Sequence, residues 1–160
     1  MSASTGWVML AGAATVVDGL LAGASLDQSI KQLPARRRIG MRAFSAYSRA
    51  SDQAHGLLWY TSLGIGGAVL TVAAAVCALF VALPSTEALP AIIAGGLAIA
   101  HSLTTARAAP INWSQRRTAD DEEALAWIFQ RFERWQAARG ALQLITFLAM
   151  ASALAIGALR

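Results

Sequence analysis

The sequence predicts an all-α integral membrane protein, a four-helix bundle with an extra interfacial helix in its last loop, forming one domain over residues 1–160. Hydrophobic residues make up 56% of the 160 residues and charged residues 14%, whereas soluble globular domains carry about 25% charged residues. Four apolar runs reach the length of about 20 residues that an α-helix needs to cross a bilayer. Basic residues flank these runs, as orientation signals do, so we expect the lipid bilayer and no nucleic acid as a partner.

The first span is predicted over about residues 6–26, and no basic region of a signal peptide precedes it, so we expect it to be retained. Trp7 is expected at the outer interface as an aromatic anchor. Asp18 lies inside this span. Because an ionisable residue in a span is costly in lipid, it usually faces protein and marks a functional site.

The second and third spans are predicted over about residues 56–83 and 89–106. A basic segment leads into the second span as a soluble, partly helical extension, and His55 lies where the span begins. The third span ends in a polar run that contains His101, and Pro110 is expected to stop its helix shortly before Asn112.

The last polar loop is predicted to hold a helix over about residues 119–135, which merges into a fourth span over 140–159. Thr118 is expected to cap this helix, and the acidic first turn that follows it suits the positive end of the helix dipole. Apolar residues then recur at helical spacing, which is typical of an amphipathic helix at a membrane surface. Trp135 and Arg139 follow, four residues apart and therefore on one helix face.

Positive charge predicts the orientation. Six Lys or Arg residues lie between 27 and 52, six lie between 107 and 139, and none lies in the connection 84–87. Positively charged loops stay on the cytoplasmic side. We therefore expect a protein of a bacterial inner (plasma) membrane, with both long loops in the cytoplasm and both termini outside.

Unusual polar residues converge on the cytoplasmic half of the predicted bundle. Asp18 and His101 each lie about twelve residues from the outer end of a span, which corresponds to a depth of about 18 Å. We predict His101 and Asp18 as catalytic residues, although Asp18 could pair for packing alone and His101 could simply bond across helices. The predicted substrate-binding residues are Asn112, Trp135, Arg139 and His55.

A metal site is a further option, because His55, His101 and Asp18 together would make a set of two histidines and one carboxylate. No ligand spacing supports it, since each residue comes from a different helix. The sequence contains no CxxC motif and no glycine-rich phosphate loop. We therefore predict no cofactor.

Three segments give the chain a resemblance to a known family. They are AGAATVVDGLLAG in the first span, TTARAAPINW after the third, and RWQAARGALQL at the start of the fourth. With these the chain resembles the anthrone oxygenase-like family of small four-helix integral membrane proteins. The family's Pro-x-Asn is matched by Pro110 and Asn112, and its Trp and Arg by Trp135 and Arg139. Asp18 matches no motif of that family.

The resemblance implies oxidation of anthrone-like compounds, as some fungal members are linked to that reaction in polyketide pathways. We expect a hydrophobic, enolisable aromatic substrate that enters sideways from the bilayer, is deprotonated by a general base and reacts with O₂. Two alternatives stay open. One is a proton-coupled exporter that uses Asp18 and works as a homo-oligomer, and the other is a non-catalytic assembly or lipid-binding protein.

The predicted orientation can be tested by labelling single cysteines introduced at Arg37 and Thr118, one in each long loop. With native Cys77 replaced, an impermeant thiol reagent should label both positions from the cytoplasmic side and neither from the outside. Labelling of the two positions from opposite sides would contradict the four-span arrangement.

Overall fold

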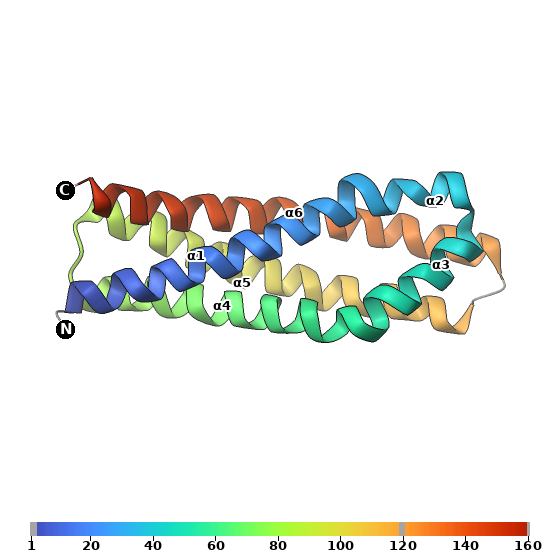
Figure 1. Cartoon of the computed structure of the whole chain (residues 1–160), viewed down its shortest axis with the longest axis horizontal. Helices are drawn as coiled ribbons and strands as arrows, with labels where there is room; N and C mark the ends of the chain where they lie inside the picture. The colour runs from blue at the N-terminus through green and yellow to red at the C-terminus, as the bar shows by residue number, and fades with distance from the viewer. Residues whose placement is uncertain (1–2, 119–120, 160) are drawn as a thin grey trace.

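The computed structural model describes residues 3–118 and 121–159, and within them every regular element is helical (Figure 1). The helices run along one long axis as an elongated bundle. Short non-α segments are written η: two π-helical segments interrupt the α-helices without ending the helical path, and one 3₁₀ segment follows the end of α5. The elements are α1 (Ala3–Asp27), η1 (Gln28–Gln32), α2 (Leu33–Ile39), α3 (Met41–Ala50), η2 (Ser51–His55), α4 (Gly56–Phe80), α5 (Ser85–Ser114), η3 (Gln115–Arg117) and α6 (Glu122–Ala158).

Four helical segments are long and apolar enough to cross a membrane, which confirms the all-α prediction and is compatible with integration into a membrane. Both chain termini lie at one end of the bundle, together with the short α4–α5 connection (Figure 1). The turn between α2 and α3 and the connection from η3 to α6 lie at the opposite end. Gly40 makes the α2–α3 turn with φ 86°, a left-handed conformation that glycine adopts without a Cβ penalty.

The bundle is longer than a bilayer is thick. The 37 residues of α6 span about 55 Å at 1.5 Å per residue, against about 30 Å of hydrocarbon.

We call the core at the end away from the termini the inner core. Arg36 and Glu133 form an ion pair of 2.5 Å beside it. The buried residues of the inner core are Leu33, Phe44, Ala108, Leu125, Phe129 and Phe132.

The predicted separate interfacial helix is not confirmed. Residues 119–120 lie outside the described residues, and residues 122–135 form the first turns of the continuous helix α6. That helix begins after Asp121, whose side chain accepts a hydrogen bond of 3.0 Å from the backbone nitrogen of Ala124. The N-cap is therefore Asp121 and not Thr118 as predicted.

The prediction that Pro110 stops the third helix is wrong, because α5 continues through it to Ser114. A proline inside a helix removes one backbone hydrogen bond and costs about 3 kcal/mol. Packing on both sides of the proline opposes this cost, since Ala108 belongs to the inner core and Asn112 is buried. The third helix thereby carries Asn112 on its own face rather than in a loop.

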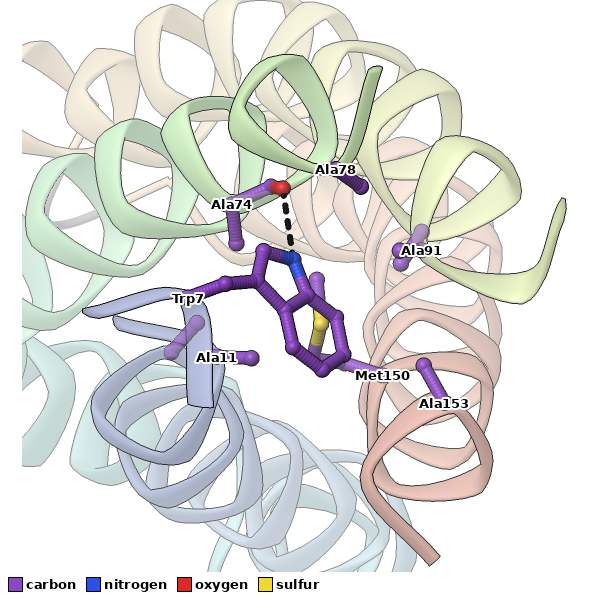
Figure 2. Close-up of a cluster of buried hydrophobic side chains, with 9 residues drawn as sticks. Trp7, Ala11, Ala74, Ala78, Ala91, Met150 and Ala153 are labelled. Atoms are coloured by element: carbon purple, nitrogen blue, oxygen red, sulfur yellow. Dashed lines mark hydrogen bonds between the residues drawn. The ribbon is translucent and has the colours of Figure 1, made fainter. Parts of the chain in front are cut away.

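A second core lies near the termini, and Trp7 occupies its centre (Figure 2). The indole of Trp7 points from α1 toward α4, where its Nε1 donates a hydrogen bond of 3.1 Å to the backbone oxygen of Ala74. Trp7 is 1% exposed, so the prediction of an interfacial anchor is wrong. The neighbouring helices present mainly alanines, such as Ala78 on α4 and Ala91 on α5, and so leave room for this one large side chain.

Replacing Trp7 by Phe removes the indole donor and part of the buried ring. We expect Trp7→Phe to lower bundle stability by about 1 kcal/mol or more, measured as thermal unfolding in detergent. Trp59→Phe is the matched control, because Trp59 is half exposed. Equal unfolding midpoints for the two variants would contradict the central place of Trp7.

Candidate functional site

Between the inner core and the Trp7 core the bundle encloses a cavity of about 530 Å³, lined by side chains from α1, α4, α5 and α6 and from the two π-helical segments. Most of its wall is apolar. A hollow of this size is sufficient for a small organic molecule. The polar side chains in the wall are Ser25, Gln28, Asp52, Tyr60, Thr61, His101, Ser102, Thr105, Asn112, Arg139 and Gln143.

Arg139 supplies the positive charge of the cavity. One guanidinium nitrogen donates hydrogen bonds to the side-chain oxygens of Gln28, at 3.2 Å, and Gln136. Its Nε is covered and has no hydrogen-bond partner. No carboxylate of the described residues forms an ion pair with it. A half-buried cation whose hydrogen-bond partners are amides keeps donor groups for an anionic ligand, because Gln28 separates it from the Asp52 carboxylate in the same wall.

Close approach of α1 and α6 gives Arg139 these partners. The next residue, Gly140, is buried, and a Cβ there would lie 3.7 Å from the hydroxyl oxygen of Ser29 and 3.8 Å from the Cβ of Ser25. Gln136, one turn earlier, donates a hydrogen bond of 3.2 Å to the backbone oxygen of Ser25. The small residue and the amide together hold α6 against α1 beside the cavity.

His101 also lies in the cavity wall, and it is 2% exposed. Its Nε2 has no hydrogen-bond partner. The hydroxyls of Thr104 and Thr105, at 2.7 and 2.9 Å, donate to its backbone oxygen and not to its ring. A buried imidazole with an unpartnered nitrogen, on a residue that lines a ligand space, has the proton-exchanging group that acid–base chemistry needs.

Asn112 is fixed by a network of side-chain amides. Its Oδ1 accepts a hydrogen bond of 2.8 Å from Gln115, and its backbone oxygen accepts one of 2.8 Å from Gln53. Gln115 accepts a further bond of 2.9 Å from Ser45 on α3. Because the oxygen of the Asn112 amide is engaged, its NH₂ group is what Asn112 offers to the cavity.

Asp52 and Gln28 are cavity residues that the sequence analysis missed. Asp52 accepts hydrogen bonds from Ser48 at 2.9 Å, from Ser51 at 3.1 Å and from Gln28 at 3.4 Å. Gln28 therefore bridges Asp52 and Arg139, since its oxygen accepts from the guanidinium and its nitrogen donates to the carboxylate. The sequence feature that could have identified Asp52 is its spacing from Ser48 and Tyr60. These residues lie four positions before it and eight after it, a spacing that places all three on one helix face.

Asp18 does not line this cavity. It is buried between α1 and α4, and its Oδ2 accepts a hydrogen bond of 2.6 Å from the hydroxyl of Thr71. Its Oδ1 has no hydrogen-bond partner and packs against Gly67, where an added Cβ would lie only 2.8 Å away. The predicted grouping of Asp18 with His101, Asn112 and Arg139 therefore holds for the last three only.

His55 and Trp135 also lie outside the cavity wall, and both are exposed. Within the described residues, no three His, Cys, Asp or Glu side chains form a group that could hold a metal ion, so His55, His101 and Asp18 make no such set. The cation–π contact recorded on α6 is between Arg131 and Trp127, at 4.4 Å, and not between Arg139 and Trp135.

The cavity therefore combines a guanidinium, an unengaged imidazole nitrogen and an amide NH₂ in a mostly apolar wall. It can hold an apolar molecule, stabilise negative charge on an oxygen of that molecule and exchange one proton with it. A comparison of the chain with protein-family models, with curated proteins and with solved structures finds no match.

The contact between Asp18 and Gly67 makes a prediction for stability. Gly67→Ala places a methyl group against the carboxylate, and we expect it to lower the free energy of unfolding by about 1–3 kcal/mol. Gly66→Ala is the matched control, because a Cβ there meets no atom within 4 Å. Unfolding in detergent measures both variants. An unchanged free energy of unfolding for Gly67→Ala would show that α1 and α4 can move apart at this contact without loss of stability.

Proposed function

We propose that the protein is a membrane-embedded, oxygenase-like enzyme, of the kind that its resemblance to the anthrone oxygenase-like family implies. Its substrate is an apolar, enolisable aromatic or polyketide-type molecule, which dissolves in the bilayer. It oxidises an acidic CH₂ group of that substrate with O₂.

The observation that carries the proposal is the guanidinium of Arg139 in the cavity wall, which Gln28 keeps apart from the Asp52 carboxylate. Arg139 faces an apolar space with two amide partners and no carboxylate partner among the described residues. Binding of a permanently charged anion would require that anion to leave water for the bundle interior, which is costly. A substrate that arrives neutral and becomes an enolate in the cavity supplies the negative charge only where the guanidinium can stabilise it.

In the proposed reaction, Nε2 of His101 removes a proton from the CH₂ carbon, and the electron pair of the broken C–H bond delocalises onto the substrate oxygen. Arg139 and the NH₂ group of Asn112 stabilise this oxyanion. The carbanion carbon forms a bond to O₂, which is reduced to a peroxide, and the peroxide then loses water to leave a carbonyl. The balance is one CH₂ and one O₂ giving one C=O and one H₂O.

The test is oxygen uptake by purified protein with an anthrone substrate. His101→Gln keeps a polar group of similar size but removes the base, so we expect turnover to fall by about 10²- to 10⁴-fold with normal thermal unfolding. Arg139→Gln should lower turnover by about 10²- to 10³-fold, because the enolate loses its cation.

Arg131→Gln is the control for loss of a positive charge from α6, because Arg131 is exposed and stacks on Trp127 away from the cavity. It should retain full activity. Full activity of His101→Gln would refute the catalytic role of the imidazole, and no oxygen uptake by the unmodified protein with any anthrone would refute the proposed reaction.

A further inference from the structure

The wall of the cavity is closed on one side and open on the other. Apart from the half-buried Arg139, the side chains that α1 and α6 contribute are almost fully covered, with Ser25 at 1% and Gln143 at 2% exposure. The side chains from α4 differ, since Ile65 is 62% and Val69 is 61% exposed although both line the cavity. Trp113 on α5 is half exposed as well. The cavity therefore opens between α4 and α5.

Taking Gly56 as the first membrane-spanning residue of α4 places this opening at the level of lipid. Ile65 and Val69 lie 9 and 13 residues after Gly56, the first residue of α4, which places them about 14 and 20 Å along the helix. That is the middle of a hydrocarbon layer about 30 Å thick. Apart from Thr61, the exposed side chains that α4 contributes to the opening are apolar, as lipid contact requires.

A shallow apolar groove continues from the opening along α4. It is lined by Val72, Ala73 and Val76, and it shares Ala68 and Val69 with the cavity wall. The groove and the cavity wall form one continuous surface. An apolar chain that lies along it can therefore extend from the lipid-facing side of α4 to the guanidinium of Arg139.

We propose that the cavity is loaded sideways from the bilayer through this lateral mouth between α4 and α5, and that Gly64 sets its width. The ligand is an amphiphile with one acidic group, which Arg139 receives, and an apolar body that lies in the mouth and the groove. The proposal rests on the proposed function for its choice of cavity, and not on the reaction with O₂.

Gly64 is a position of α4 in the cavity wall that carries no side chain. A Cβ at Gly64 would meet no atom within 4 Å, so space extends from its backbone into the mouth. Gly66 offers an internal comparison, because a Cβ there is equally free but the residue lines neither the cavity nor the groove. Two residues apart on a helix, the two glycines face directions about 200° apart.

The experiment uses the full chain in nanodiscs of phosphatidylcholine, with dansyl-undecanoic acid as an acidic amphiphilic probe. Energy transfer from tryptophan to dansyl reports binding, and stopped-flow mixing gives the association rate. We expect Gly64→Phe to slow association by at least about tenfold and Gly64→Val to slow it less, whereas Gly66→Phe stays within about twofold of the unmodified protein. Arg139→Gln should weaken equilibrium binding by about tenfold or more.

An unchanged association rate in Gly64→Phe, or equal slowing by Gly66→Phe, would overturn the lateral mouth. If Gly64→Phe fails to fold, Gly64→Val decides the question, because its smaller side chain enters the same free space. Adding phosphatidylglycerol to the nanodiscs distinguishes the source of the acidic group. Competition with the probe would assign the group to a lipid headgroup, and lack of competition would assign it to a free acid.

The result is independent of the proposed chemistry, because the probe has no enolisable ring. Probe binding with the expected rates but no oxygen uptake would retain the mouth and reject the oxidation. Oxygen uptake that Gly64→Phe leaves unchanged would retain the oxidation and reject the mouth.

Discussion

Lipid offers no hydrogen bonds, so a polar group inside the spanning part of this bundle must be satisfied by another part of the bundle. Trp7 and Thr71 follow this constraint, since one donates to the backbone of Ala74 and the other to Asp18. Seven covered side-chain atoms of the described residues have no hydrogen-bond partner, and three of them belong to Asp18, Ser29 and Thr118, outside the cavity wall. The other four belong to residues that line the cavity, namely Ser25, His101, Arg139 and Gln143. A ligand with polar atoms of its own would complete them.

The cavity persists because it lies between two packed regions. At the end near the termini, alanines such as Ala11 and Ala74 surround Trp7, and they bring the helices together closely. At the other end, Leu125 and Phe129 pack in the inner core, and Gln115 ties α3 to the end of α5. The helices are thus held together on both sides of the cavity. A site built on helices held in this way is more rigid than one built on loops.

From the sequence, the depth of a residue along its helix is predicted better than the direction in which its side chain points. Counting residues placed His101 in the cytoplasmic half of its span, Asn112 and Arg139 lie beyond the ends of their spans on that same side, and the structure lines one cavity with all three. Asp18 has a comparable depth in its own span, but its side chain points between α1 and α4, a direction set by helix packing. Gln28 and Asp52 escaped prediction because each lies in a π-helical segment. A π-helical turn holds one more residue than an α-helical turn and so shifts which residues share a face.

The arrangement of charge in the cavity connects the proposed chemistry with the lateral mouth. Arg139 and Asp52 line the same space but form no ion pair, and Gln28 bridges the two side chains instead. Direct pairing would neutralise the guanidinium within the protein, whereas separation keeps its positive field available to a ligand. An anion that approached from the lipid side would lose its hydration before it reached this field. A neutral acid avoids that cost, because it crosses the apolar mouth uncharged and gives up its proton beside His101 and Arg139. The apolar entrance and the cationic interior therefore favour the same kind of molecule, one that is neutral in the membrane and anionic only inside the bundle.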